Sequence, residues 1–264
     1  MPFPEVDRVI YTTNPLDRVI CQLRFPPILK IDTEIPSQFQ DKLRSEYPNL
    51  SESKEVLFNI QMGMQNKIPS EEFKQLSGSS ESKNYEFSSE NNQWKINLTR
   101  SFLSLSTNHY TRWDEFRERL QIAIKTFVDI YQPLAFSRIG LRYIDIIMRS
   151  KLKLAEEGWD KLIQPYLLGI MALDDIKDEI LQYDSTFLIN LEDGESKVRV
   201  ATSTVKQASS GETCYMIDSD FFNAKKTKHE EVMKKLDFFN VRAARLFRWC
   251  ITEKLHSSME PTKI

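Results

Sequence analysis

The sequence predicts an α+β fold made of two tandem units, each running from a strand through a short helix and several antiparallel strands to a long helix. Two observations support this prediction. Segments with alternating apolar residues precede each of two long stretches whose apolar residues recur at steps of three and four. The same order of elements also occurs twice along the 264 residues. We expect a saddle-like or helix-grip-like arrangement, with both long helices on one side of the sheets.

The first half opens with an extended arm over residues 1–14, where two early prolines disfavour helix. Residues 16–25 alternate as a strand that ends at a pair of prolines. A short helix then runs between Pro36 and Pro48. The remaining short elements expected in this half are strands at residues 55–62, 85–87, 94–98 and 102–106, with a hairpin joining the second to the third and a polar loop at 68–82.

The long helix of the first half is expected over residues 113–131, because its large apolar residues share one face at helical spacing. Thr111 or Asn108 is expected to cap its first turn, and Pro133 to end it.

Residues 136–148 open the second half as the strongest strand candidate, since they are rich in β-branched and aromatic residues. The later elements, in chain order, are a helix at 159–166, a short helical piece at 172–177, a hairpin of 186–191 and 197–205 around an Asp-Gly turn, a strand at 213–217 and the longest helix at 228–256.

A shift of about 120 residues aligns the two halves. It places Arg18 on Arg138 and Cys21 on Leu141, and it aligns Trp94 in a later strand with Cys214. We therefore interpret residues 1–134 and 135–264 as two α+β halves of a duplicated fold that form one compact unit. The alternative is one α+β domain without internal symmetry.

Alternate side chains of residues 136–148 face opposite sides of the expected strand. One face is apolar apart from Asp145, and the other presents Arg138, Gly140 and Arg142 before it becomes apolar. Guanidinium groups on either side of a glycine are typical of an anion or phosphate site, in which the glycine leaves room for a ligand.

Arg18 and Arg24 would extend this candidate ligand face if the first predicted strand lies beside the central one. The alternative is that Arg138 and Arg142 form structural salt bridges to nearby acids and are covered by a helix. Under either interpretation, we expect Asp145 to pair with a charged group of this kind, such as an arginine, or to lie at the end of the strand. We do not expect it to act as a catalytic acid.

The C-terminal helix is the second candidate surface. From residue 223 to the end, ten Lys or Arg oppose five acids, a local charge of +5. The candidate face for a partner or nucleic acid comprises Lys234, Lys235, Arg242, Arg245, Arg248 and Trp249. Arginine and tryptophan together are typical of protein interfaces. The alternative is an ordinary solvated helix face.

Composition excludes several protein classes. With 41% apolar residues the chain can bury a core without disulfides or metals, and a net charge of -2 gives no general attraction to nucleic acid. Cys21, Cys214 and Cys250 are widely separated, so we expect reduced thiols and a cytoplasmic protein. We expect no signal peptide, because the N-terminus lacks a basic region followed by an apolar one. We expect no membrane span, because no segment approaches roughly 18 consecutive apolar residues.

Catalytic motifs are missing from the sequence. It has no phosphate-binding glycine loop, no nucleophile elbow and no spacing of histidines or cysteines typical of a metal site. Residues 174–178 match an acidic magnesium-diphosphate motif of prenyl-transferring enzymes, but that chemistry needs an all-helical cavity with a second acidic cluster. We interpret them as a solvated acidic turn and predict no catalytic residue, metal or cofactor.

Several motifs together resemble a sporadically distributed, uncharacterised family of prokaryotic proteins of about this length. They lie at residues 15–16, 23–27, 94–99, 102–106, 110–116 and, most clearly, at 138–145 (Arg-Ile-Gly-Leu-Arg-Tyr-Ile-Asp), with a looser fit at 247–252. The family has no settled activity to transfer. Its patchy distribution implies accessory genes of the mobile or defence-associated kind.

The leading hypothesis is therefore a non-enzymatic binding or adaptor protein that acts with a protein partner, or as a homo-oligomer. The alternative is a nucleic-acid or nucleotide binder that uses the arginine-bearing strand face or the basic helix. An enzyme of unfamiliar type is the third hypothesis.

Overall fold

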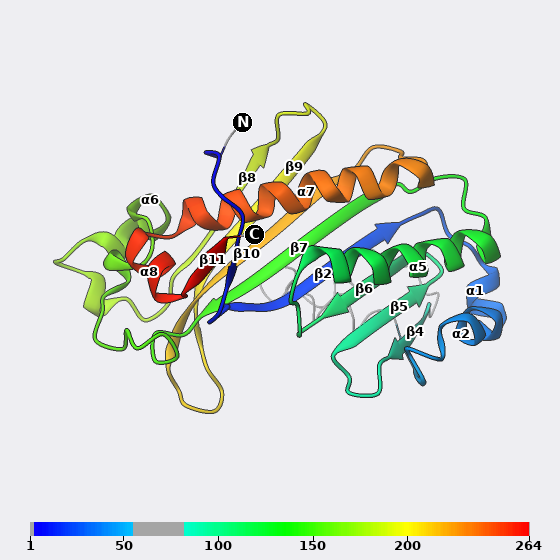
Figure 1. Cartoon of the computed structure of the whole chain (residues 1–264), viewed down its shortest axis with the longest axis horizontal. Coiled ribbons are helices and arrows are strands. Elements are labelled where there is room, and N and C mark those ends of the chain that lie inside the picture. The colour runs from blue at the N-terminus through cyan, green and yellow to red at the C-terminus, as the bar shows by residue number, and fades with distance from the viewer. Residues whose placement is uncertain (1–2, 55–81, 264) are drawn as a thin grey trace, which may run out of the picture.

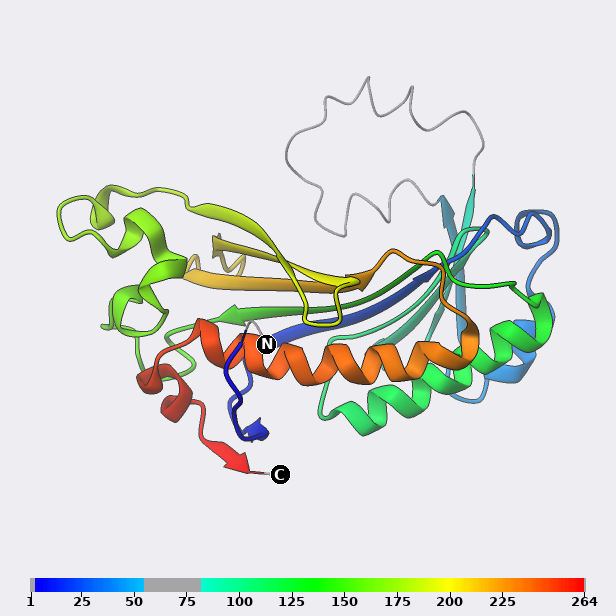
Figure 2. The same cartoon turned by 90° about the horizontal axis from the view of Figure 1, so that it is seen from above.

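The computed structural model describes residues 3–54 and 82–263, which build a nine-stranded antiparallel sheet with two long helices on one face (Figures 1 and 2). In sheet order the strands are β3 (Asn49–Lys54), β4 (Lys83–Ser88), β5 (Trp94–Thr99), β6 (Phe102–Thr107), β2 (Leu16–Arg24), β7 (Arg138–Ile147), β10 (Thr213–Asn223), β9 (Ser196–Lys206) and β8 (Asp184–Asn190). A separate two-stranded sheet pairs β1 (Val9–Tyr11) with β11 (Pro261–Lys263).

The long helices are α5 (Trp113–Tyr131) and α7 (His229–Cys250). The shorter helices are α1 (Lys30–Thr33), α2 (Ser37–Leu43), α6 (Pro165–Leu168) and α8 (Glu253–Ser258), with 3-10 turns η1 (Trp159–Lys161), η2 (Gly169–Ala172) and η3 (Lys177–Glu179). Within the described ranges, none of the helices combines the length and the apolar character needed to cross a membrane.

The two halves of the chain form opposite wings of the one sheet. β2 and β7 pair at its centre, and the order outward from β2 is β6, β5, β4 and β3. The order outward from β7 is β10, β9 and β8. In each wing, the strand that precedes the long helix pairs with the first strand of that wing: β6 pairs with β2, and β10 pairs with β7. The predicted α+β class with a large antiparallel sheet is confirmed, and the strands of both halves belong to one sheet.

The core lies between the sheet and the long helices. On β7 the apolar face is buried as the alternation predicts, with Ile139 and Leu141 fully inaccessible to solvent. Both long helices contribute their apolar stripes to one continuous cluster. Asp237 of α7 ties the helices together, because it accepts a hydrogen bond from Trp113 Nε1 (2.8 Å) and pairs with Arg117 Nε (2.9 Å).

Two predictions about the second half are wrong. Trp94 lies on β5, whose counterpart in strand order is β9, whereas Cys214 lies on β10, so the alignment of these two residues fails. The predicted helix over 228–256 is two helices. Ile251 is extended and forms a bridge with Ile163, and Thr252 then caps α8 by accepting a hydrogen bond from Leu255 N. An apolar pattern that continues across a break cannot reveal such a bridge.

Smaller differences concern caps and short elements. Arg112 precedes α5 as the N-cap and makes no side-chain cap, while the Thr111 hydroxyl donates to Glu115 Oε2 (2.6 Å) instead. The helix expected at 159–166 is only η1 and α6. β3 was not predicted, because it is a polar, exposed edge strand without alternation. The strand expected at 55–62 and nearly all of the loop at 68–82 lie outside the described residues.

Candidate functional site

The candidate ligand face lies on the side of the sheet opposite α5 and α7 (Figure 2). β2 is the neighbour of β7, so Arg18 and Arg24 do extend the face of Arg138, Gly140 and Arg142. In the register of the two strands Arg24 lies opposite Arg138, so the two residues are neighbours on this face. The long helices therefore do not cover these arginines, contrary to one part of the structural alternative.

Arg142 makes a two-pronged ion pair with Asp218 of the neighbouring strand β10. Its Nε and Nη2 donate to the two carboxylate oxygens at 2.7 and 2.5 Å. The side chains of Arg142 and Asp218 are only 13% and 5% exposed. Burial acts to lower the pKa of Arg142, but the hydrogen bonds and charge of Asp218 outweigh it and raise this pKa. The pair is geometrically suited to join the strands.

Arg138 pairs with the next acid of β10, Asp220, at 2.7 Å from Nη2 to Oδ2. Its guanidinium also lies over the ring of Phe222, 4.9 Å from the ring centroid, and Phe222 is the register partner of Gly140. A Cβ on Gly140 would collide with this guanidinium. The space that the sequence assigned to a ligand thus holds Arg138 itself, which crosses the glycine to reach β10.

Arg18 differs from the other arginines of this face. It is exposed and forms no ion pair with any residue that the structure describes. It lines a hollow of about 160 Å³ together with Glu86, Lys95 and Asn97 of the first wing. Arg24 is exposed at the end of β2, where its Nε donates to Gln22 Oε1 (3.0 Å).

The basic residues of α7 are mostly paired with carboxylates from other parts of the chain. Arg242 pairs with Glu192 in the β8–β9 turn and lies 3.6 Å from the centroid of the Phe238 ring. Lys235 pairs with Asp193 of the same turn at 3.1 Å. The sequence could not show this, because the hairpin tip and the helix are about 40 to 50 residues apart.

The C-terminal end of α7 is tied to the N-terminal arm and to α8. Arg245 lies 3.2 Å from Glu5, and Arg248 pairs with Glu253. Lys234 is exposed and has no ion pair with a described residue. The predicted basic face is therefore largely neutralised within the chain.

Trp249 is half-buried between two rings. It stacks on Tyr166 with centroids 4.5 Å apart, and Phe3 lies 5.5 Å away on the arm. The Tyr166 hydroxyl also donates to the backbone oxygen of Trp249. Instead of presenting a free aromatic surface, Trp249 anchors the segment that carries Tyr166.

That segment, residues 166–181, is called here the apolar excursion, and it lies between β7 and β8 at one end of the molecule (Figure 1). Its backbone is fixed: Tyr183 Oη and Tyr215 Oη both donate to Leu167 O, at 2.7 and 3.1 Å. Five large apolar side chains on it are nevertheless between 44% and 97% exposed: Tyr166, Ile170, Leu173, Ile176 and Leu181.

Sequence analysis missed this surface, although a signal was present. Leucines and isoleucines alternate irregularly with acids there and match neither a helical nor a strand period. Asp174, from the acidic motif, is solvated and pairs locally with Lys177 at 2.6 Å. In the described ranges, no three His, Cys, Asp or Glu side chains gather to hold a metal ion, and the three cysteines are buried free thiols.

No protein-family model matches this chain, and no curated protein matches it either. Its function is therefore argued from the geometry of its own residues.

Proposed function

We propose that this chain is a non-enzymatic binding or adaptor protein that docks a partner protein onto the apolar excursion. The observation that carries the proposal is the exposure of five large apolar side chains within 16 residues of a backbone that is itself anchored. Soluble proteins rarely expose clustered apolar groups of this size unless the surface binds something. Burying one such side chain at an interface contributes up to about 2 kcal/mol.

The charge of the excursion indicates the chemistry of the partner. Residues 166–181 contain four acids and one basic residue, Lys177. A complementary partner would present apolar side chains surrounded by Lys or Arg. A second copy of this chain, meeting the same patch about a twofold axis, would bring the acids against one another. The charge balance therefore supports a different protein, and its gene is expected nearby in an accessory or defence-type locus.

Nucleic-acid or nucleotide binding is the second candidate. Arg18 favours it, because its guanidinium is exposed near Lys95 and Asn97. The pairing of Arg138 and Arg142 with aspartates weighs against it, since those guanidinium groups are already neutralised. Phosphate binding should weaken steeply with added salt, so binding that is absent even at low ionic strength would refute this candidate.

We also propose that the halves derive from one duplicated unit and that the sheet is saddle-like. The support is the shared strand order and the pairing of β2 with β7. Cys21 lies opposite Leu141 in that pairing, and the 120-residue shift aligns the same two residues. A twofold axis through this pair would exchange the central strands.

The test of the binding proposal uses two highly exposed leucines. Leu181 in the excursion is 97% exposed, and Leu134, which follows α5, is 89% exposed. Neither Leu181→Asp nor Leu134→Asp should disturb folding, because both side chains already face water. The tagged chain is purified from its host, the co-purifying protein is identified by mass spectrometry, and its affinity for each variant is measured.

Leu181→Asp should weaken the complex at least about tenfold, a loss of about 1.4 kcal/mol, while Leu134→Asp should bind like the unmodified protein. Equal affinity for both variants would place the interface elsewhere. Substrate turnover that a single substitution abolishes would contradict the non-enzymatic function itself.

A further inference from the structure

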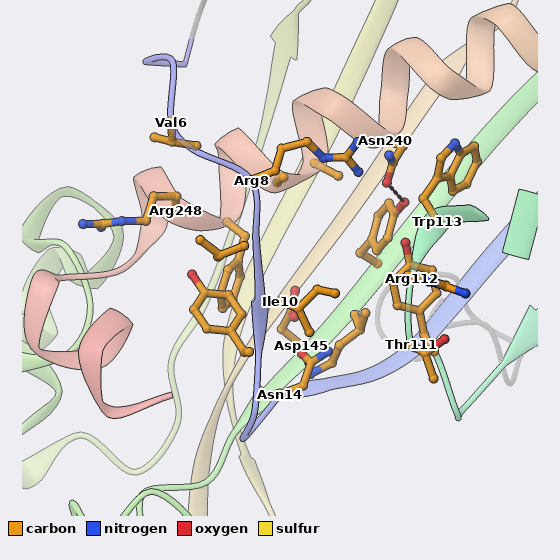
Figure 3. A pocket seen from close by; sticks show the side chains of 18 of the residues that line it. Val6, Arg8, Ile10, Asn14, Thr111, Arg112, Trp113, Asp145, Asn240 and Arg248 are labelled. Carbon is orange, nitrogen blue, oxygen red and sulfur yellow. Dashed lines mark hydrogen bonds between the residues drawn. The ribbon is translucent and has the colours of Figure 1, made fainter. Parts of the chain in front are cut away.

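A cavity of about 150 Å³ lies on the helix-covered side of the sheet, independent of the apolar excursion (Figure 3). The N-terminal arm, β7, α7 and the segment before α5 enclose it. Five aromatic side chains line it: Tyr11, Tyr110, Trp113, Tyr143 and Phe247. A cavity of about this volume accommodates one benzene-sized ring.

Asp145 of β7 lines this cavity and lies behind Ile10 of the arm (Figure 3). Its side chain is on the apolar face of the strand and only 6% exposed. It has no hydrogen bond or ion pair with any residue in the described ranges. The register of β2 shifts beside it, between Leu16 and Arg18. A buried carboxyl without a partner is costly, and the expectation that Asp145 pairs with a cation is not met.

Asn240 of α7 also lines the cavity and carries a second unsatisfied group, which has almost no accessible surface. Its Oδ1 accepts a hydrogen bond from the Tyr143 hydroxyl at 3.0 Å, but its buried Nδ2 has no partner. Only 6% of Asn240 is exposed. Buried polar groups in folded proteins are nearly always satisfied, so the unpaired Asp145 carboxyl that lines the cavity favours an occupant able to pair with it.

We propose that this cavity binds a small organic amine, whose ammonium group pairs with Asp145 and whose apolar body packs among the five rings. A carboxylate would offset the charge of the ammonium, and aromatic faces attract cations. An anion would meet the Asp145 carboxylate, and a neutral apolar ring would leave the buried carboxyl without a partner. The cavity volume limits the body of the amine to about one ring.

The cations that line the cavity beside Asp145 are Arg8, Arg112 and Arg248, and Arg112 is exposed to water. Arg8, on the arm, is exposed to water at the edge of the cavity, where its charge is screened. Arg248 of α7 is engaged by Glu253. Asp218 of β10 lies on the opposite face of the sheet and adds negative charge near Asp145.

Binding should depend on pH, because an ammonium pairs with the ionised carboxylate. Burial, and then the charge of Asp218, raise the pKa of Asp145 to about 8. The fraction of ionised Asp145, and with it the affinity, should rise about 50-fold between about pH 6 and pH 8.

The tyrosines near the cavity and the Cys250 thiol stay neutral in that interval. Burial raises the pKa of Tyr11 to about 12, and burial raises the pKa values of Tyr110, Tyr143 and Cys250 above their ordinary range. His256 contacts the Tyr11 hydroxyl at 2.9 Å, and burial followed by the charge of Arg248 lowers its pKa.

The test is calorimetry of the full chain with benzylamine, and with benzyl alcohol and benzoate as neutral and anionic matches. Smaller and larger primary amines, from methylamine to phenethylamine, complete the series. Asp145→Asn removes the charge, and Asp41→Asn, which removes an exposed carboxylate on α2 outside the cavity, is the matched control. Asp145→Asn should fold, because it removes a buried ionisable group, and its thermal transition verifies this.

An amine should bind the unmodified protein and the Asp41→Asn variant alike, more tightly as the pH rises, and at least about tenfold more weakly in Asp145→Asn. The inference is overturned if benzyl alcohol binds as tightly as benzylamine, if affinity does not change with pH, if Asp145→Asn binds as well, or if no amine of the series binds at millimolar concentration. None of these outcomes bears on the apolar excursion, so the two proposals fail separately.

Discussion

The buried carboxyl of Asp145 should lower the stability of the ligand-free protein as the pH rises. Below about pH 4, both the folded and the unfolded chain hold this carboxyl protonated. Between about pH 4 and pH 8 the unfolded chain releases the proton, while the folded chain retains it, because burial raises the pKa of Asp145 to about 8. The free energy of unfolding therefore falls across this interval, and it stops falling above about pH 8.

The size of the effect follows from the two pKa values. An exposed aspartate has a pKa of 3.8, and each unit between this value and the pH contributes about 1.4 kcal/mol. At pH 7 the free energy of unfolding should therefore be reduced by about 4 kcal/mol, a large fraction of the stability of an ordinary domain. The Asp145→Asn variant cannot ionise at this position and should not show the loss.

The assay is urea denaturation of both proteins at several values between about pH 4 and pH 8, with the unfolding free energies compared at each pH. All other ionisable groups are shared, so the difference isolates Asp145. The free energy of unfolding of the variant, relative to that of the unmodified protein, should increase steadily as the pH rises. A difference that stays constant with pH, or one that grows in the opposite direction, would refute the assignment of Asp145 as a buried, unpaired acid.

Two further predictions concern the Arg142–Asp218 ion pair and the N-terminal cap of α8. Arg142→Met should lower the free energy of unfolding by about 3 kcal/mol, because it leaves the buried Asp218 carboxylate without its two-pronged partner. Adding Asp218→Asn to that variant should restore part of the lost stability in the same denaturation assay. If the free-energy changes of the two single substitutions simply add in the double variant, the two residues do not interact. Thr252→Ala should cost about 1 kcal/mol, because the threonine caps α8, and an unchanged thermal transition would show that the cap is unimportant.

Periodic segments were predictable from the sequence. The alternation of β2 and β7, and the apolar stripes of α5 and α7, depend on which residues face the core, so burial follows from spacing. The Asp-Gly turn between β8 and β9 was also predictable, since Gly194 adopts a positive φ of 68° that glycine tolerates best.

The partners of charged residues were not predictable. Asp218 and Asp220 face the arginines of β7 only because β10 continues to Asn223, whereas the predicted strand stopped at residue 217. The register that brings Arg142 to Asp218 joins residues 76 apart, and local pattern carries no information about it. For the same reason, the sequence could not show that acids of the β8–β9 turn pair with Lys235 and Arg242 of α7.

The exposure of the apolar excursion was hidden for a different reason. Its leucines and isoleucines have the composition of a core, and which of them face water depends on tertiary contacts, such as those of Tyr183 and Tyr215 with Leu167 O, that the sequence does not show. Likewise, the isolation of Asp145 depends on what the arm and α7 place around it, because the strand sequence alone allows either a partner or none.

The most direct test of the proposed function is amide hydrogen exchange of the chain alone and in complex with its co-purified partner. Binding should slow exchange in residues 166–181, where exposed apolar side chains would become covered. The surrounding core strands should change little. Protection that appears on the arginine-bearing strands β2 and β7 instead, with none in the apolar excursion, would contradict the assigned docking surface.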